Sequence, residues 1–428
     1  MPNARDFALF QLDRINLPGW KTNQLRQQID PPVDPRDLSL AEQIRMGVIK
    51  NHGLLEHLLE HYSSHPGRID PLVRKIVAIG LYQLRFLTRI PPSAAVDEAV
   101  EQARRFGRKH GAGFVNAVLR RAAREPDVPL PNAKDNPEKY AEVVLSHPPE
   151  LFRRLVDLLG TEKAIGFCEH NNTEPPTLVR AFQEAAFPPA ELSPELRVRP
   201  HDQPGIFVVE SGKRATFADW AVKGLAQVQD ATAARVAEHL DIRPGQQIMD
   251  RCAGMGTKTL QMRDYLGNQG WIMAVDPSEP RCDALRSLLA TRMISNVAVV
   301  QASMVRQVVD LKPPAFDRIL VDVPCSNSGV LARRPEARYT QTPQALASLV
   351  KLQDQIMDDT ADYLRPGGLL IYSTCSVWPE ENEHRISRFL DTHSSSFEQL
   401  DAELTRPSPI GEPTRYRDGG FFAVLRRR

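Results

Sequence analysis

The residues of this sequence that are best suited to chemistry are two cysteines, Cys325 and Cys375, which lie 50 positions apart. Each follows an apolar run and is surrounded by small polar residues, as in V-P-C-S-N-S-G and S-T-C-S. Such neighbours keep a thiol accessible, whereas an inert, buried thiol is the better interpretation for Cys168 and Cys282. Asp322 lies just before the first of these motifs. The two thiols and this carboxylate are therefore the candidate catalytic groups.

A glycine-containing loop is the candidate ligand-binding segment. After an apolar run that ends at Asp250, the residues R-C-A-G-M-G-T-K lead into a helical stretch. Gly254 and Gly256 allow the backbone to turn tightly and approach a ligand, and the free N–H groups of a helix start favour an anion. Asp276 ends the next apolar run, where it can accept hydrogen bonds from ribose hydroxyls. The loop matches neither a Walker A motif, because Thr257 replaces the glycine before the lysine, nor a complete dinucleotide fingerprint, so an ordinary turn with a helix cap is the alternative.

The elements that must position these groups alternate regularly from about residue 225 onward. Apolar runs alternate with helical stretches, which predicts a parallel sheet flanked by helices. The runs end at Asp250, Asp276, Gln301, Asp322 and Ser373. In such a sheet the ligand lies beyond the carboxyl ends of the strands, and every candidate group above falls at one of those ends.

These motifs resemble those of the cytosine-5 RNA methyltransferase family. The likeness rests on D-V-P-C-S-x-S-G-V at 322–330, on Y-S-T-C-S at 372–376 and on the loop D-x-C-A-x-x-G-x-K-T at 250–259. It extends to D-G-G-F-F-A-V-L near the end of the chain. Amine methyltransferases carry N-P-P-Y in place of D-V-P-C, so the motif is specific. The resemblance implies an α/β, Rossmann-like class I methyltransferase domain that uses S-adenosylmethionine.

The resemblance also implies roles for the candidate catalytic residues. Carbon 5 of cytosine is a poor nucleophile, and a thiolate that adds to carbon 6 makes it reactive. The family implies Cys375 as that nucleophile, Cys325 as the group that assists release, and Asp322 as a contact of the base near ring nitrogen 3. Because DNA cytosine-5 enzymes attack with their proline-cysteine motif, Cys325 is the alternative nucleophile. Lys258 could hold a cysteine as thiolate, steady the loop or simply face solvent.

The implied cofactor contacts come from the glycine-containing loop and from later strand ends. They are Cys252, Ala253, Gly254, Met255, Gly256, Thr257, Lys258, Asp276, Ser303 and Asp322. The sequence departs from the family pattern at two places. The usual A-A-P-G-G-K loop is A-G-M-G-T-K here, and the acid commonly found one strand later is replaced by Q-A-S, which leaves Ser303 as a weak hydrogen-bonding group.

The first 130 or so residues are predicted to form an all-α bundle. Apolar residues recur at helical spacing from Ala95 onward, and similar stretches cover 40–62 and 70–87. The runs L-V-R-K-I-V-A-I-G-L-Y-Q-L and F-V-N-A-V-L-R-R resemble the NusB-type RNA-binding domain. The pairing of this domain with the catalytic domain resembles the RsmB/NOP family, which implies small-subunit (16S) ribosomal RNA as the partner.

We therefore expect a multidomain chain with three segments. A NusB-like helical RNA-binding bundle covers 1–130, and the methyltransferase domain covers 225–428. Between them, 131–224 is expected to hold a linker and a small α+β RNA-binding segment. Its elements are predicted to be one helix over 151–168 and short strands at T-L-V-R-A-F and G-I-F-V-V.

Local charge, rather than net charge, predicts RNA contacts, because the formal net charge is only +1. Between Arg104 and Arg124 the chain has seven Lys or Arg residues and no Asp or Glu. This run is either a solvated helix face or a phosphate-contacting patch. The candidate RNA contacts are Arg104, Arg105, Arg120, Arg121, Arg333, Arg334 and, beside the D-V-P-C loop, Arg338.

The remaining composition narrows the class of protein. Five cysteines without a close C-x-x-C pair argue against a disulfide framework and a structural zinc site. Because no apolar run reaches about 18 residues and the start lacks a signal-peptide core, we expect a cytoplasmic protein without a membrane span. We also expect a monomer without a metal. Two alternatives stay open: the same chemistry on transfer RNA, and a catalytically weak RNA-binding or ribosome-assembly factor.

Overall fold

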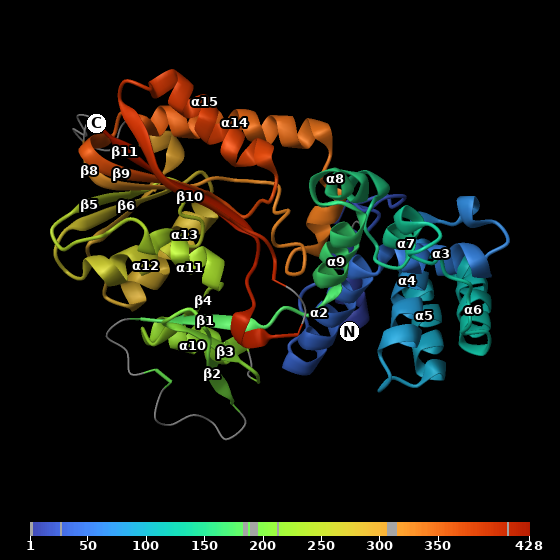
Figure 1. Ribbon diagram of the computed structural model, residues 1–428. Helices are drawn as coiled ribbons and strands as arrows, with labels where there is room; N and C mark the ends of the chain where they lie inside the picture. Colours follow the sequence, from blue (N-terminus) through green and yellow to red (C-terminus); the bar gives the residue numbers. More distant parts are fainter. Residues whose placement is uncertain are drawn as a thin grey trace. The chain divides into compact units, whose positions relative to one another are not determined.

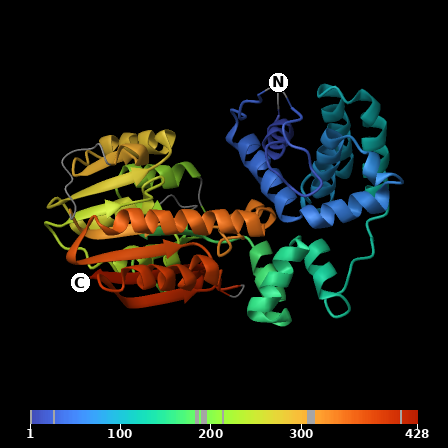
Figure 2. The ribbon, with the colours of Figure 1, turned by 90° about the horizontal axis from the view of Figure 1, so that it is seen from above.

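The computed structural model describes residues 3–25, 28–182, 187–188, 196–211, 214–305, 315–408 and 411–428. The chain divides into two compact units (Figure 1 and Figure 2). The helical unit contains residues up to 172 together with the short segment 334–340, and the α/β unit contains 173–333 and 341–428. Within the described ranges, no helix is long and apolar enough to cross a membrane.

The helical unit confirms the predicted all-α start of the chain. Its helices are α1 (Ala4–Leu12), α2 (Pro35–Lys50), α3 (His52–Tyr62), α4 (Pro71–Phe86), α5 (Pro92–Arg105), α6 (Lys109–Arg124), α7 (Pro137–Val143), α8 (Pro149–Leu159) and α9 (Thr161–Asn172). Asp70 illustrates how they begin, because its carboxylate accepts hydrogen bonds from the N–H groups of Leu72 and Val73 at the start of α4. The buried faces of α1 to α6 share one hydrophobic core.

Two predicted helices are divided in the structure. The stretch 40–62 forms α2 and α3, which meet at Asn51. The prediction of one helix over 151–168 is wrong, because Gly160, with a φ of 79°, separates α8 from α9. Glycine adopts this backbone conformation without steric cost. Contacts group α7 to α9 with the helical unit, which therefore extends past residue 130 to 172.

The α/β unit has a seven-stranded sheet with the order β10-β11-β9-β8-β5-β6-β7. Its strands are β5 (Gln247–Asp250), β6 (Trp271–Asp276), β7 (Val297–Gln301), β8 (Phe316–Asp322), β9 (Leu364–Thr374), β10 (Phe397–Thr405) and β11 (Gly420–Arg427). Strands β5 to β9 pair in parallel, whereas β10 and β11 add an antiparallel edge. The predicted Rossmann-like sheet is confirmed.

Helices cover both faces of this sheet (Figure 1). Helices α14 (Pro343–Ala361) and α15 (Glu383–His393) pack on one face, and α11 (Ala231–Glu238), α12 (Thr257–Leu266) and α13 (Glu279–Thr291) pack on the other. Successive residues of β5 show the alternation, because Met249 joins the core on the α14 side and Ile248 joins the core on the α12 side. A strand buried on both faces needs such a continuous apolar run.

A smaller antiparallel sheet confirms the predicted α+β segment. Its order is β2-β3-β1-β4, from β1 (Thr177–Ala181), β2 (Val198–Pro200), β3 (Ile206–Val209) and β4 (Ala226–Val228), and α10 (Arg214–Val222) precedes β4. Strand β4 pairs with β1 and lies beyond residue 224. The small sheet therefore continues past the boundary expected from the sequence.

A buried ion pair holds the first loop of the helical unit against α4. Lys75 Nζ lies 2.5 Å from Asp13 Oδ1, and both side chains are completely buried. Lys75 also donates to the carbonyl of Lys21, and Asp13 Oδ2 accepts the N–H of Leu25 at 2.7 Å. A buried charge that loses its partner is strongly destabilising.

We expect Lys75→Met to lower the free energy of unfolding of the helical unit by about 3–5 kcal/mol, because the Asp13 carboxylate would stay buried without a cation. Urea-induced unfolding of the full chain measures this change. Lys134→Met, at an exposed lysine of the same unit, should stay within about 0.5 kcal/mol of the parent. Equal stability of the two variants would contradict the assignment.

Candidate active site

The two candidate cysteines lie side by side, after the ends of neighbouring parallel strands. Strands β8 and β9 pair with Asp322 opposite Ser373, so the segments that follow them leave the sheet at the same edge. The Sγ atoms of Cys325 and Cys375 are 3.0 Å apart. Both residues are partly exposed. The sequence-predicted pair is therefore brought together in one site.

The hydrogen bonds of the two thiols distinguish them chemically. Hydrogen bonding to Cys375, together with burial, raises the pKa of the Cys325 thiol well above its ordinary value. Cys325 therefore keeps its proton, which it can donate toward the Cys375 sulfur 3.0 Å away. Asn327 Oδ1 lies 3.2 Å from Cys375 Sγ. Asn327 itself has a φ of 60°, a left-handed conformation in which asparagine is enriched.

A lysine–aspartate pair adjoins the thiols. Lys258 Nζ lies 2.6 Å from Asp322 Oδ2, and Ser373 Oγ donates to Asp322 Oδ1 at 2.5 Å. Burial alone would lower the pKa of Lys258, but the Asp322 carboxylate and, more weakly, Cys375 outweigh burial and raise that pKa. Lys258 is thus a permanent cation of the site, and its interpretation as a lysine that simply faces solvent is wrong.

A buried carboxylate that the sequence analysis missed joins the two cysteine loops. Glu381 is fully buried and accepts hydrogen bonds from Ser326 N at 2.8 Å, from Gln353 Nε2 at 3.0 Å and from the hydroxyls of Ser326 and Ser376. Each serine directly follows one of the cysteines. One carboxylate therefore fixes both loops. The run W-P-E-E-N-E was the available signal, but nothing in it distinguishes this glutamate from its solvated neighbours.

A cavity of ≈150 Å³ opens beside Cys375. This is the volume of roughly five water molecules in the liquid, which suits one small ring. Lys258 and Asp322 also line it. Further lining residues were not singled out from the sequence; they include Asp230, Thr232, Asp418, Gly419, Gly420 and Phe421.

The loop after β5 has the geometry of an anion-binding helix start. Gly254 and Gly256 have φ angles of 57° and 84°. Helix α12 begins after Gly256 with no side-chain cap, which leaves its first N–H groups for a carboxylate. A Cβ at Gly256 would lie 2.3 Å from Leu285 Cδ1, whereas one at Gly254 would meet open space. These features fit a bound nucleotide-like cofactor.

Asp276 closes this loop from the neighbouring strand. Its Oδ2 accepts the N–H of Gly254 and its Oδ1 accepts the N–H of Ser278, both at 2.9 Å. Each carboxylate oxygen can accept a second hydrogen bond, so Asp276 retains acceptors for ribose hydroxyls. Burial raises the pKa of Cys252, in the loop, to about 12, so its thiol stays neutral. Ser303 is exposed in the short helix η2 (Ala302–Met304) that follows β7.

The basic run of the helical unit lies on α5 and α6 and is paired to differing degrees. Of its four candidate arginines, Arg104, Arg105 and Arg120 are exposed and Arg121 is partly exposed. Arg105 pairs with Asp6 and Glu98, so acids from elsewhere in the unit reach this run. Arg120 Nε donates to Asn116 Oδ1 at 2.8 Å. The absence of acids from the run in the sequence therefore overstates its free positive charge.

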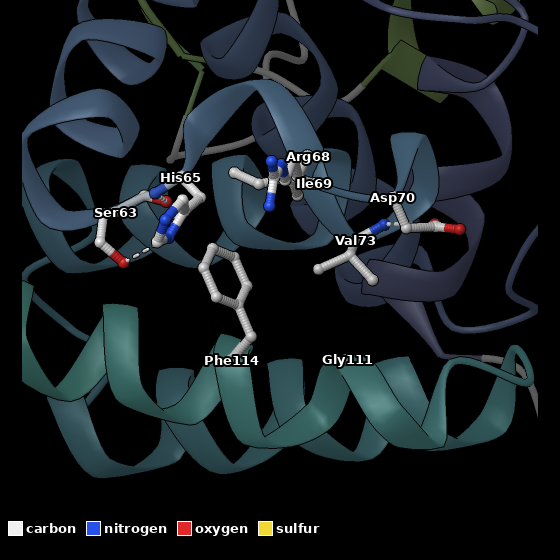
Figure 3. A pocket seen from close by; sticks show the side chains of 9 residues that line it. Ser63, His65, Arg68, Ile69, Asp70, Val73, Gly111 and Phe114 are labelled. Carbon is white, nitrogen blue, oxygen red and sulfur yellow. Dashed lines mark hydrogen bonds between the residues drawn. The ribbon is translucent and has the colours of Figure 1, made fainter.

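A hollow of ≈300 Å³ lies beside the same helix α6 (Figure 3). Phe114 and Gly111 of α6 form part of its lining, and His65, Arg68 and Asp70 face them from the chain between α3 and α4. An aromatic ring beside polar and cationic side chains is compatible with an unstacked base. The sequence analysis did not single out this hollow.

The candidate arginines after the D-V-P-C loop differ from one another. Arg334 is exposed, whereas Arg333 is partly buried and lies 2.5 Å from Asp418 Oδ2. The interpretation of Arg338 as an RNA contact is wrong, because its side chain is buried and donates to main-chain carbonyls, including that of Asn171 at 2.6 Å. Separately, no group of three or more His, Cys, Asp or Glu residues that could hold a metal occurs in the described part of the chain.

Comparison with known proteins identifies both units. The model of the 16S rRNA methyltransferase RsmB/F matches residues 237–418, and the model of the NusB family matches residues 2–124. A relative from Synechocystis, named probable ribosomal RNA small subunit methyltransferase B, is 30% identical over 100% of both chains.

Two solved structures share the fold. The crystal structure of PH0851 superposes with a TM-score of 0.73 at 21% identity and covers 92% of this chain and 91% of its own. That of NSun6 from Pyrococcus horikoshii with SFG superposes with a TM-score of 0.50 at 18% identity, over 65% and 98%. Because the likeness to ribosomal RNA small subunit methyltransferase B runs the full length of both chains and unites a NusB domain with a methyltransferase domain, the chain belongs to the RsmB/NOP family of S-adenosylmethionine-dependent methyltransferases.

Proposed function

We propose that the protein methylates carbon 5 of a cytosine in small-subunit (16S) ribosomal RNA through a covalent adduct with Cys375. The observation that carries this proposal is the pair of thiols 3.0 Å apart beside the Lys258–Asp322 ion pair. Methylation of an amine needs no nucleophilic thiol, whereas carbon 5 of cytosine becomes reactive only after addition at carbon 6. The small cavity beside Cys375 supports a single pyrimidine as the reacting group.

The first step is addition of the Cys375 sulfur to carbon 6 of the base, with the thiol proton of Cys375 passing to ring nitrogen 3. A bond forms between Sγ and carbon 6, and the electrons of the ring double bond become available at carbon 5. Negative charge also spreads toward ring nitrogen 3. Asp322 hydrogen-bonds a proton at that nitrogen, and Lys258, which is held 2.6 Å from Asp322, supplies the compensating positive charge.

Release of the product depends on both cysteines. When S-adenosylmethionine is bound, it supplies the methyl group for carbon 5. The hydrogen of carbon 5 must then leave as a proton while its electron pair restores the double bond and expels the Cys375 sulfur. Cys325 gives its proton to this departing sulfur 3.0 Å away and, now a thiolate, accepts the proton of carbon 5. The proton on ring nitrogen 3 leaves to solvent as the ring is restored, so both cysteines end as thiols, as they began.

The proposed cofactor contacts are the loop 252–258, Asp276, Ser303 and Asp322. The uncapped N–H groups at the start of α12 suit the carboxylate of the methionine part. Asp276 suits the ribose hydroxyls, because both of its oxygens are held in place by backbone N–H groups. Ser303 offers one hydroxyl in place of the acid that the family commonly has.

The proposed RNA contacts are Arg104, Arg105, Arg120 and Arg121 of the helical unit and the exposed Arg334. Arg333 is not among them, because it is partly buried and paired with Asp418. Phosphate binding needs positive charge at the surface and carries no sequence information. The target cytosine must leave its stack to reach a thiol in a cavity, which favours a loop or single-stranded site.

Two other functions share most of these features: the same chemistry on transfer RNA, and a ribosome-assembly role with weak catalysis. Bisulfite sequencing of RNA from cells that lack the protein separates them. Loss of one 5-methylcytosine from small-subunit ribosomal RNA supports the proposal. Loss confined to transfer RNA supports the first alternative, and unchanged methylation in both RNAs supports the second.

Substitution of each cysteine tests the covalent mechanism. Cys375→Ala should abolish both methylation and attachment to RNA, because it removes the attacking sulfur. Cys325→Ala should still transfer the methyl group but stall before release, leaving an adduct that survives denaturing electrophoresis. Cys168→Ala, at a buried thiol of the helical unit, should behave like the parent. Accumulation of adduct in the Cys375 variant instead would make Cys325 the nucleophile.

Asp276→Ala tests the cofactor site. We expect it to weaken S-adenosylmethionine binding by about 1–3 kcal/mol, because it removes the acceptors for the ribose and leaves the Gly254 N–H without its partner. Isothermal titration calorimetry on the purified protein measures the affinity. Ser303→Ala is the matched comparison and should change binding by less than about 1 kcal/mol. Unchanged binding by the Asp276 variant would remove this residue from the site.

Charge reversal tests the basic run on α5 and α6. Glutamate at Arg104, Arg105, Arg120 and Arg121 should weaken binding to small-subunit ribosomal RNA and flatten its dependence on salt, because fewer counterions are released. Affinity for S-adenosylmethionine should not change. Arg120→Glu alone is the cleanest single variant, because it breaks only a hydrogen bond to Asn116. Parental RNA affinity in the fourfold variant would identify a plain solvated face.

A further inference from the structure

Arg333 lies between two buried carboxylates of the α/β unit. Its Nε donates to Asp418 Oδ2 at 2.5 Å, and one Nη atom lies 3.8 Å from Asp230 Oδ2. Both Nη groups also donate to the carbonyl of Pro176 at 3.2 Å, and the guanidinium carbon lies 5.3 Å from the ring centre of Tyr416. Nε and both Nη groups of Arg333 thus have partners inside the unit, although the side chain is 29% exposed.

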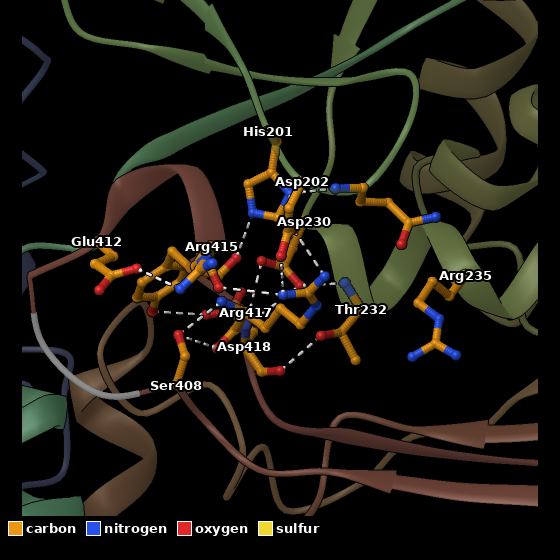
Figure 4. A network of polar contacts seen from close by, with 12 residues as sticks. His201, Asp202, Asp230, Thr232, Arg235, Ser408, Glu412, Arg415, Arg417 and Asp418 are labelled. Atoms are coloured by element: carbon orange, nitrogen blue, oxygen red, sulfur yellow. Dashed lines mark hydrogen bonds and ion pairs between the residues drawn. The ribbon is translucent and has the colours of Figure 1, made fainter.

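The two carboxylates lie close together (Figure 4). The N–H of Asp418 donates to Asp230 Oδ2 at 3.3 Å, and Tyr416 OH donates to Asp418 Oδ1 at 2.9 Å. Their side chains are only 9% and 6% exposed. Burial, followed by the charge of Asp418, raises the pKa of Asp230 to about 7. The charge of Arg333 opposes this rise, so without Arg333 the pKa of Asp230 would be higher still and the buried pair would be harder to ionise.

The segment 416–418, which contains Asp418, is also anchored to residues 201–202 beside the small sheet. His201 Nε2 lies 2.9 Å from the carbonyl of Tyr416. Arg417 holds the Asp202 carboxylate with two hydrogen bonds, of 2.8 Å and 3.1 Å (Figure 4). Residues 416–418 are therefore held on one side by Arg333 and on the other by residues 201–202.

The anchored segment leads directly to the nucleophile. Gly419 N donates to the Gly329 carbonyl at 2.8 Å, and Gly329 N donates to the Cys375 carbonyl at 2.9 Å. The two glycine backbones touch, because a Cβ at Gly329 would lie 2.5 Å from the Gly419 carbonyl oxygen. Gly419 and Gly420 also line the cavity beside Cys375. A shift of residues 418–420 would therefore move a cavity wall and the backbone of the attacking residue together.

We propose that Arg333 is a positioning residue for the covalent step. By pairing with Asp230 and Asp418, it fixes the segment 418–420 and, through Gly329, the backbone of Cys375 against the target base. This inference rests on the proposed function, because it concerns the nucleophile named there. It also separates Arg333 from the arginines that contact phosphate: a phosphate contact contributes to RNA affinity and its salt dependence, whereas a positioning residue contributes to the rate at saturating RNA.

Single-turnover adduct formation tests the inference. The Cys325→Ala protein, with saturating unmodified small-subunit ribosomal RNA and S-adenosylmethionine, is the parent, because its adduct accumulates. Arg333→Gln should slow adduct formation by about 10–100-fold, the scale of a displacement of about 1 Å. The dissociation constants of RNA and S-adenosylmethionine and the salt dependence of RNA binding should match the parent.

Two rescue variants distinguish the charge balance from a general structural role. Arg333→Lys should restore part of the rate, because an ammonium group keeps a cation between the carboxylates. Adding Asp230→Asn to Arg333→Gln should also restore part of it, because only one buried carboxylate then remains. Arg235→Gln is the matched control: Arg235 pairs with Glu403 in the same unit but does not line the cavity, so the parental rate should persist.

The outcomes separate this inference from the function on which it rests. A parental rate in Arg333→Gln, or weaker RNA binding with a smaller salt dependence at an unchanged rate, would overturn the positioning role. If neither rescue variant restored any of the rate of adduct formation, the positioning role would also be overturned. If the Cys325→Ala parent bound RNA and S-adenosylmethionine yet formed no adduct, the covalent mechanism itself would have failed. Where Arg333→Gln does not fold, Arg333→Lys and the double variant are compared directly with the parent.

Discussion

The parallel pairing of β8 and β9 is the constraint on which the site depends. Two segments that are 50 residues apart in the chain become neighbours because Asp322 and Ser373 lie opposite each other in the sheet. Their side chains meet in a hydrogen bond of 2.5 Å, and the loops that follow bring Cys325 and Cys375 into contact. A slip of one residue would turn one of these side chains to the opposite face. The relative positions of the catalytic groups are therefore set by the register of β8 and β9.

Buried charge maintains this geometry beyond the sheet. The carboxylate of Glu381 accepts hydrogen bonds from both cysteine loops, and Lys258 is held by Asp322. Groups that are fixed before the base arrives need not reorganise as charge develops, which is the basis of electrostatic catalysis. Each of these ions is costly to bury alone. The folded state should therefore lose less stability when both members of the Lys258–Asp322 pair are replaced by apolar residues than when one of them is.

The sequence predicted the sheet and the groups at its strand ends better than the contacts behind them. Apolar runs ending at Asp276 and Asp322 were sufficient, because a parallel strand buried on both faces must be continuously apolar. The role of Glu381 was not predictable, since its partners come from three separate elements and only burial marks it. The prediction of a single helix over 151–168 was wrong for a local reason, because Gly160 turns the chain between α8 and α9. The prediction that Arg338 contacts RNA was wrong for a tertiary reason. Its guanidinium is buried and donates hydrogen bonds to main-chain carbonyls that are distant in the sequence.

The segment 334–340 belongs to the helical unit, so this unit can be completed only late in synthesis of the chain. Arg338 donates to the carbonyls of Lys50, Leu145 and Asn171, and all of these acceptors leave the ribosome long before it does. Domains usually fold from the N-terminus as they are synthesised. Here the first unit lacks the buried hydrogen bonds from Arg338 until translation has passed that residue. Completion of the helical unit therefore follows translation of β1 to β8 of the α/β unit.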